Sequence, residues 1–176
     1  MVKRDLIRYI GIVITVILAI LSLNKWVFES VTIDKQMANT YLKKGDRILV
    51  NVQGKPTYGD FVLYRVDGKD HVGRIIAKEG DSVRYMDNIL YLNDQIKHES
   101  YLSQETTTDD FSTAKLPKSQ SEKIGKNSYL ILNDRRSNTA DSRTYGLIKK
   151  EQIIGKLSFR LNPLDKMGFV ENGVAD

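Results

Sequence analysis

The chain has 176 residues, of which 41% are apolar and 28% charged, and its formal net charge is +5. This composition is typical of a globular domain, and it excludes a largely disordered chain, a collagen and a multi-span membrane protein. The absence of Cys excludes disulfide scaffolds, Cys-ligated zinc, iron–sulfur clusters and thiol catalysis, and two His are too few for a His-rich metal site. We therefore expect neither a metal nor a cofactor.

An apolar run lies near the N-terminus, where Tyr9 to Asn24 contains 16 residues without a charge. At about 1.5 Å per residue the run covers roughly 24 Å, and counting through Phe28 brings it close to the ~30 Å hydrocarbon core of a bilayer. It is apolar on every face, unlike a globular surface helix, and its end lacks the small residues of a cleavage site. We expect one transmembrane signal anchor over residues 9–28, in preference to a buried core helix or a cleaved signal peptide.

The basic residues indicate how this anchor is oriented. Lys3, Arg4 and Arg8 precede the run, so the positive-inside rule predicts a cytoplasmic N-terminus over residues 1–8 and an extracytoplasmic domain over 29–176. The protein would then be a single-pass cell-membrane protein. Residues 1–25 carry a balance of +3 and the remainder only +2. The folded domain thus lacks the basic excess of a nucleic-acid-binding protein, and we expect no nucleic-acid partner.

The remainder of the chain has the pattern of a mainly β domain. Short runs rich in β-branched and aromatic residues alternate with turn signals such as Lys44-Gly45-Asp46. Asp87-Asn88 separates two apolar runs and predicts a hairpin turn. An antiparallel sheet or a partly closed barrel is the expected architecture. The predicted strands are Arg47–Val50, Phe61–Val66, Val72–Ala77, the two arms within Ser82–Asp94, Tyr129–Leu132 and Ile153–Leu161.

Residues 97–126 differ from their surroundings. The segment is rich in Ser, Thr, Gln, Lys and Asp and contains few large apolar residues. It predicts a polar insertion between strands. Two roles remain open for it, a surface that contacts a partner and a solvated variable loop.

Several segments together resemble type I signal peptidase, the S26 family of membrane-anchored serine–lysine proteases that remove secretory signal peptides. The strongest match is Asn133–Gly146, which has the spacing of the family pattern GDNRxxSxDSRxxG throughout. The resemblance covers nearly the whole chain except residues 97–126, and it implies a signal-peptidase-like β domain. The other matching segments are Phe28–Ile33, Gly59–Val62, Arg74–Asp81, Ile154–Lys156 and Phe159–Phe169.

Within the strongest match, the resemblance implies supporting roles rather than reacting ones. The family Ser that supports the catalytic Lys falls on Thr139. Asp141 and Arg143 are two residues apart, so a plain structural ion pair is the other interpretation. The positions assigned to the supporting scaffold are Thr139, Asp141, Ser142, Arg143, Asp134 and Arg136.

The nucleophile that the family carries is absent at its expected position. Counting back from Lys44-Gly45-Asp46 places the catalytic Ser on Met37, and a register one residue earlier places it on Gln36. Neither residue has a hydroxyl. The hydroxyl that helps to hold the oxyanion in the family would be Lys35 or Asp34.

The general base is absent as well. The family Lys falls on Gly73, directly before Arg74, and Gly has no side chain that could accept a proton. The mechanism needs a desolvated Lys amine beside a Ser oxygen. His71 lies two residues before Gly73 and could serve as a displaced base, with Thr40 or Tyr41 as unconventional nucleophiles.

The resemblance therefore implies a pseudoenzyme, a degenerate homologue similar to the SipA-type proteins of Gram-positive pilus loci. Such a protein would act as a chaperone-like assembly factor in pilus polymerisation, binding an extended secreted or pilin chain beside a sortase. The alternatives are an active signal peptidase with unconventional catalytic residues, and a membrane protein that uses the fold for an unrelated partner. The candidate peptide groove comprises Gln36, Met37, Ala38, Gly73 and Arg74.

Overall fold

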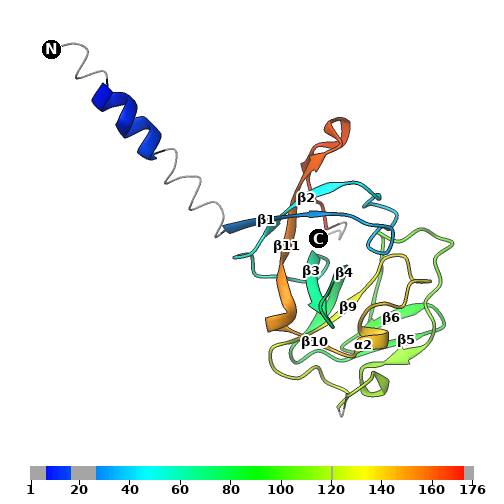
Figure 1. Cartoon of the computed structure of the whole chain (residues 1–176). Coiled ribbons are helices and arrows are strands. Elements are labelled where there is room, and N and C mark those ends of the chain that lie inside the picture. The colour runs from blue at the N-terminus through cyan, green and yellow to red at the C-terminus, as the bar shows by residue number, and fades with distance from the viewer. Residues whose placement is uncertain (1–6, 17–26, 120, 173–176) are drawn as a thin grey trace.

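The computed structural model describes residues 7–16, 27–119 and 121–172 (Figure 1). Residues 7–16 are helical and exposed. In these described ranges, no helix is both long enough and apolar enough to cross a bilayer. The anchor expected over residues 9–28 falls in part on residues 17–26, which lie outside the described residues. Its last residue, Phe28, is the first residue of a strand.

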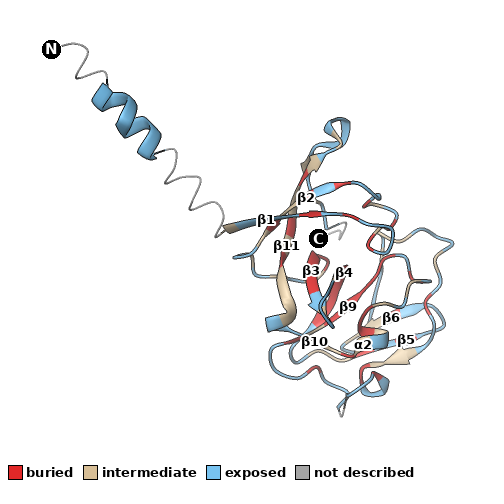
Figure 2. Ribbon diagram, in the orientation of Figure 1, coloured by how far each residue is buried: buried red, intermediate tan, exposed pale blue. Residues whose placement is uncertain are grey.

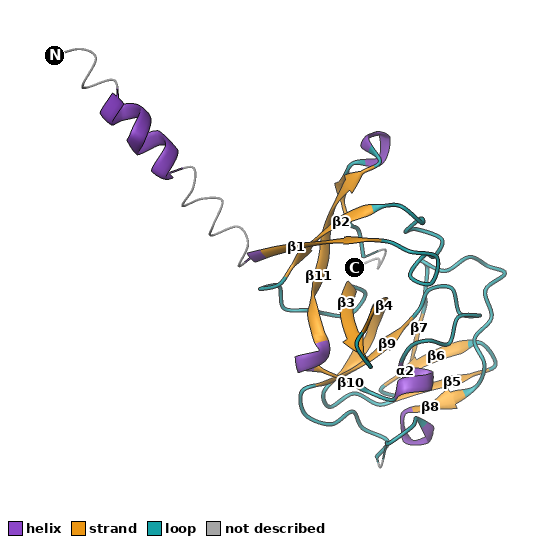
Figure 3. Ribbon diagram, in the orientation of Figure 1, coloured by secondary structure: helices purple, strands orange, loops and turns teal. Residues whose placement is uncertain are grey.

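Most of the regular structure is β, as Figure 3 shows, and this confirms the expected class. The described residues form one eight-stranded antiparallel sheet in the order β1-β2-β11-β3-β4-β9-β10, and β12 pairs with β11. β1 and β10 end this path, so the sheet is open, and the partly closed barrel is corrected to an open sheet. The strands are β1 (Phe28–Thr32), β2 (Arg47–Asn51), β3 (Phe61–Val66), β4 (Lys69–Lys78), β9 (Ser128–Leu132), β10 (Ile148–Lys149), β11 (Ile153–Asn162) and β12 (Gly168–Phe169).

A second, smaller sheet has the order β7-β6-β5-β8. Asp87 and Asn88 join β5 to β6 with φ of 52° and 62°, the left-handed values of a two-residue hairpin turn, so the predicted hairpin is confirmed. The strands are β5 (Val83–Met86), β6 (Ile89–Leu92), β7 (Gln95–Lys97) and β8 (Phe111–Ser112). Short helices are η1 (Thr113–Lys115), α2 (Ser142–Tyr145), η2 (Lys150–Gln152) and η3 (Leu164–Lys166).

Burial is concentrated on β3, β4 and β9, in the middle of the large sheet (Figure 2). One apolar cluster lies against β1, β2, β3 and β11 and includes Met37 and Phe61. Another lies between the two sheets and receives Leu116 and Ile124 from the polar segment 97–126. That segment is therefore packed onto the domain by these two residues and by β8, which pairs with β5, although most of its side chains are exposed.

Candidate functional site

The loop after β1 carries both candidate nucleophile positions. The Asp34 carboxylate accepts hydrogen bonds from the backbone N–H of Gln36 at 2.7 Å and of Met37 at 2.8 Å, which folds the chain into a tight turn. The turn directs Met37 into the apolar cluster, where it is 8% exposed, and leaves Gln36 exposed. Ala38 is half-buried against the same cluster.

The loop between β9 and α2 holds this turn in place. Asn138 donates its side-chain amide to the Gln36 carbonyl at 2.9 Å, and Arg135 donates to the Lys35 carbonyl at 3.3 Å. A cavity of only about 10 Å³ remains where the two loops meet β4, which is about the space of one water molecule. The cavity is lined by Gln36, Met37, His71, Val72, Asn133, Asn138 and Ala140. None of these seven residues carries a hydroxyl.

Gly73 lies on β4 opposite Val62 of β3 and does not line this cavity. A Cβ added at Gly73 would stand 2.6 Å from Ile131 Cγ2 and 3.1 Å from the Leu132 carbonyl oxygen. Ile131 is fully buried on the neighbouring strand β9. The space that a side chain at position 73 would need is therefore already filled.

His71 does line the cavity, in contact with aromatic rings. Its imidazole is 5.4 Å from the ring of Tyr64 and 5.2 Å from that of Tyr145, measured between centroids. Burial lowers the pKa of His71 below its usual 6.5, so the ring is neutral at pH 7. A neutral imidazole can accept a proton, but Met37 and Gln36 share the cavity with it and offer no hydroxyl. Thr40 and Tyr41 are not among the lining residues.

The residues assigned to the scaffold connect α2 to β9. Asp141 is fully buried and accepts hydrogen bonds from the backbone N–H of Asn133 and of Arg143. Arg143 pairs with Asp141 at 2.6 Å and also donates to the carbonyls of Arg136 and Asn138. Ser142 accepts the backbone N–H of Ile131. These contacts shape the loop that carries Asn138 and Arg135.

Thr139 joins this set of contacts only through its backbone carbonyl. It is exposed, and its carbonyl accepts hydrogen bonds from the Thr144 hydroxyl and the Asp141 N–H. It does not line the small cavity.

Arg74 does not line the small cavity and is almost fully buried. It forms a two-pronged pair with Asp134, at 2.9 and 2.6 Å, and donates to the Gly59 carbonyl. Its guanidinium is 4.1 Å from the ring centre of Phe61 and 3.8 Å from that of Tyr101. Of the predicted groove, the structure thus brings Gln36 and Met37 together at the cavity and places Ala38 against the cluster beneath it. Gly73 and Arg74 are not among the residues that line the cavity.

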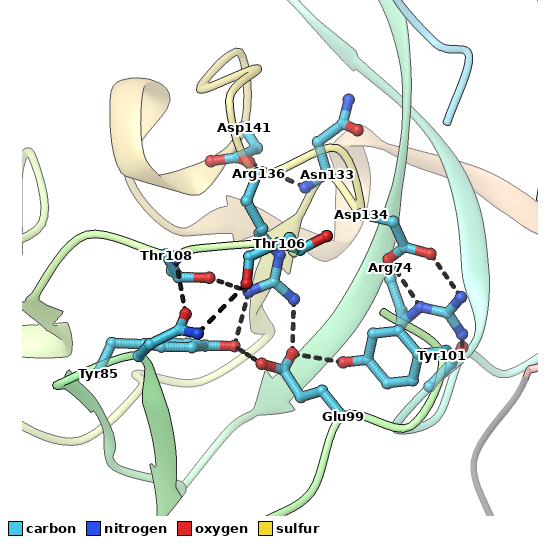
Figure 4. A network of polar contacts seen from close by, with 12 residues as sticks. Arg74, Tyr85, Glu99, Tyr101, Thr106, Thr108, Asn133, Asp134, Arg136 and Asp141 are labelled. Carbon is cyan, nitrogen blue, oxygen red and sulfur yellow. Dashed lines mark hydrogen bonds and ion pairs between the residues drawn. The ribbon is translucent and has the colours of Figure 1, made fainter. Parts of the chain in front are cut away.

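Arg136 belongs to a second buried network, which Figure 4 shows beside the first. Its guanidinium pairs with Glu99 at 2.5 Å and donates to the Tyr85 hydroxyl at 2.7 Å. Tyr85 and Tyr101 both donate to the Glu99 carboxylate. Burial raises the pKa of both phenols, which keeps them protonated as donors.

Sequence reasoning missed Glu99, Tyr101 and Thr108, because they lie in the polar segment 97–126. Thr108 is buried and accepts a hydrogen bond from Arg136. One signal in the sequence indicated that a further carboxylate was needed: Asn133–Gly146 contains three Arg but only two Asp. In the structure, one of these Asp, Asp134, pairs with Arg74. A carboxylate for Arg136 had to come from elsewhere, and Glu99 supplies it.

The comparisons with known proteins agree on one family. A family model described as "Signal peptidase, peptidase S26" matches residues 6–162. Signal peptidase IB of Staphylococcus aureus (strain MRSA252) is 31% identical over 181 residues, covering 95% of this chain and 95% of its own. A protein of the same strain named Inactive signal peptidase IA is 33% identical over 168 residues, covering 93% of this chain and 95% of its own.

A solved structure is similar as well. The crystal structure of a signal peptidase I from Enterococcus faecalis V583 matches with a TM-score of 0.54 and 29% sequence identity. The match covers 60% of this chain and 98% of that chain. The likeness therefore extends from sequence to the arrangement of strands.

Proposed function

This chain belongs to the S26 signal peptidase family, and from that premise we propose that it is a catalytically inactive member that binds extended secreted chains. The observation that carries the proposal is the small cavity at Met37, whose lining contains no hydroxyl. Acyl transfer by this family's chemistry needs a hydroxyl activated by a neighbouring base. The similarity to a protein named Inactive signal peptidase IA supports the same conclusion.

Gly73 gives independent support for inactivity. The resemblance assigns this position to the Lys that accepts the proton from the nucleophile. Here it has no side chain, and Ile131 fills the adjoining space. Loss of either half of such a pair costs several orders of magnitude in rate, and in this protein both halves are replaced.

The membrane anchor is part of the proposal. The apolar run that begins at Tyr9, preceded by Lys3, Arg4 and Arg8, would hold residues 29–176 on the outer side of the cell membrane. β1 begins at Phe28, so the domain would start directly at the membrane surface. Secreted chains emerging from the membrane would pass within reach of the domain.

The proposed role is that of a chaperone-like assembly factor for a secreted or pilin chain, acting beside a sortase. An extended chain is recognised most simply by main-chain hydrogen bonds to a strand edge, with pockets for alternate side chains. Among the described strands, β1 and β10 are the two ends of the large sheet, and each has a strand on one side only. Such edges can pair with a secreted chain that has not yet folded, because its backbone is still extended and free to form hydrogen bonds.

A cleavage assay tests inactivity. The full-length protein in detergent is incubated with a secretory preprotein, and signal peptidase IB of S. aureus serves as the active control. We expect no cleavage by the wild type, because no hydroxyl lines the cavity. The single variants Gln36→Ser and Met37→Ser each add a hydroxyl to the cavity that His71 lines, and they test whether this imidazole can replace the missing Lys. Cleavage at the signal-peptide junction by the wild type would overturn the proposal. The variants His71→Ala, Thr40→Val and Tyr41→Phe would then identify the residues of an unconventional active site.

A binding assay tests the second half of the proposal. The same preparation is immobilised and incubated with a major pilin, once in its unfolded form and once in its folded form. We expect retention of the pilin in its unfolded form and weaker retention after folding. Retention of neither form would favour the remaining alternative, a signal-peptidase fold used for an unrelated partner.

A further inference from the structure

The C-terminal segment of residues 169–172, which begins in β12, is held by hydrogen bonds of its backbone. The Val170 N–H donates to the Ser158 carbonyl at 2.9 Å, which continues the pairing of β12 with β11. The Tyr41 hydroxyl donates to the Phe169 carbonyl at 3.4 Å and accepts from the Glu171 N–H at 3.2 Å. The Asn172 carbonyl accepts a hydrogen bond from Arg74. Each residue from Phe169 to Asn172 is thus bound through its main chain.

The side chains of this segment alternate, as those of an extended strand do. Val170 packs against the apolar cluster that contains Met37 and Phe61. Phe169 is 81% exposed, and Glu171 is exposed as well. The Phe169 ring lies edge-on to that of Phe159, at 5.2 Å between centroids, so Val170 is the one side chain of residues 169–171 that enters the apolar cluster. The other contacts of the segment are made by its main chain.

The groups that receive the segment are themselves firmly held. The Tyr41 ring is stacked on Phe61 at 6.0 Å, and the Arg160 guanidinium lies 4.8 Å from its centre. Arg74 is fixed by Asp134 and by the two aromatic rings on either side of it. Because these contacts do not involve residues 169–172, the receiving groups stay positioned when the segment leaves.

We propose that Tyr41, Arg74, Ser158 and the cluster surface under Val170 form a binding site for an extended segment of another polypeptide, a site that residues 169–172 occupy in its absence. We call this the tail site. It binds the main chain of an extended segment that has a small aliphatic residue at its centre. The incoming segment must displace residues 169–172 of this protein. The inference rests on the proposed binding function and adds a binding site for the secreted chain to the strand edges of β1 and β10. In Figure 1 the red end of the chain turns back from the β11–β12 hairpin towards the middle of the domain.

Binding of a peptide in trans tests the tail site. The probe is a fluorescently labelled hexapeptide with the sequence of residues 167–172, and the protein is the full chain in detergent. Val170→Asp places a charge against the apolar cluster and releases the chain's own segment. We expect this variant to bind the peptide at least about tenfold more tightly than the wild type, because a tethered segment competes at an effective concentration near the millimolar range.

Two controls make the result specific. Met167→Asp adds the same charge at an exposed position just before the segment, and this variant should bind the peptide as weakly as the wild type. Adding Tyr41→Phe to Val170→Asp removes the hydroxyl that both donates and accepts, and the double variant should lose most of the gained affinity. A probe peptide with Asp in place of Val should not bind.

The proposal is overturned if the folded Val170→Asp variant binds no peptide, or if the wild type binds equally well. If Val170→Asp fails to fold by circular dichroism, Val170→Gly, which removes the side chain without adding charge, takes its place under the same criteria. The assay contains no secretory protein. Failure to retain a pilin would therefore overturn the proposed function and leave the tail site standing, whereas failure of peptide binding overturns the tail site alone.

Discussion

Gly73 and Ile131 share one space between β4 and β9. A Cβ at position 73 would stand 2.6 Å from Ile131 Cγ2, well inside contact distance, and Ile131 is fully buried. We expect Gly73→Ala to lower the free energy of unfolding by about 1–3 kcal/mol, as overpacking in a core does. Gly73→Lys should cost more and restore no cleavage. Urea denaturation of the single variants measures the loss.

A double-mutant cycle identifies Ile131 as the cause. Ile131→Ala alone opens a cavity and should cost about 2–5 kcal/mol. Combined with Gly73→Ala it should cost less than the sum of the two, because the new methyl enters the space that the Ile vacates. Gly125→Ala is the matched control, since nothing lies within 4 Å of its Cβ. Additive costs in the cycle would refute the shared space.

His71 makes stability depend on pH. Burial lowers the pKa of its imidazole below the usual 6.5, so between that lowered value and about 6.5 the unfolded chain binds the proton and the folded chain does not. Stability is therefore complete above pH 6.5 and falls as the pH decreases, by at most about 1.4 kcal/mol per pH unit for one proton. Urea denaturation between pH 7.5 and 5.5 should show this decline.

The variant His71→Phe keeps an aromatic ring between Tyr64 and Tyr145 and should remove the decline in that range. His98 is exposed and provides the control, because His98→Gln should leave the pH profile as it is. An unchanged profile in His71→Phe would assign the pH dependence to other groups.

At the level of elements, the small sheet is joined to the loop after β9 by an ion pair. Glu99, at the start of the polar segment, meets Arg136 with side-chain exposures of 9% and 0%. Replacing one partner of a buried pair leaves the other charge without compensation. We expect Glu99→Gln to lower the free energy of unfolding by about 3–5 kcal/mol.

The exposed pair of Arg84 and Asp94 is the comparison, with side-chain exposures of 53% and 86%. Asp94→Asn should change stability by less than about 1 kcal/mol. Replacing both Glu99 and Arg136 with apolar residues of similar size should cost less than Glu99→Gln alone, since no buried charge remains unpaired. Equal effects of Glu99→Gln and Asp94→Asn in urea denaturation would contradict the structural role of the buried pair.

The elements that sequence predicted well are those with a local signal. Phe61–Val66 was predicted with the bounds it has, and the Asp87-Asn88 turn is where the pattern placed it. Strands of two residues, such as β8 and β10, were missed because two residues cannot display an alternating pattern. Their positions depend on partner strands far along the chain.

The candidate site divides in the same way. The positions of Met37 and Gly73 followed from motif spacing, which is local information. The contact of Gly73 with Ile131 and the pairing of Glu99 with Arg136 join residues dozens of positions apart. The excess of Arg over Asp in Asn133–Gly146 indicates that a further carboxylate is needed, but it does not identify Glu99. The tail contact of Asn172 with Arg74 spans 98 positions. Such contacts arise only when the sheet assembles.

At the scale of the whole molecule, the membrane topology can be tested with introduced thiols, because the chain has no Cys. A Glu105→Cys variant carries its thiol at an exposed position of the domain that we propose to be extracytoplasmic. We expect it to react with a membrane-impermeant maleimide in intact protoplasts. Lys3→Cys should react only after lysis, because the positive-inside rule keeps that end in the cytoplasm. The reverse pattern of labelling would invert the proposed orientation.

The filled space beside Gly73 constrains the order in which mutations at positions 73 and 131 could accumulate. In the proposed inactive protein, a mutation that brings a base to position 73 meets Ile131 if it comes first. If Ile131 becomes smaller first, a cavity opens in the fully buried sheet. Either order passes through a destabilised intermediate, whichever mutation arises earlier. If the protein is inactive as we propose, the packing of one methyl group is an epistatic barrier to the gain of a base at this position.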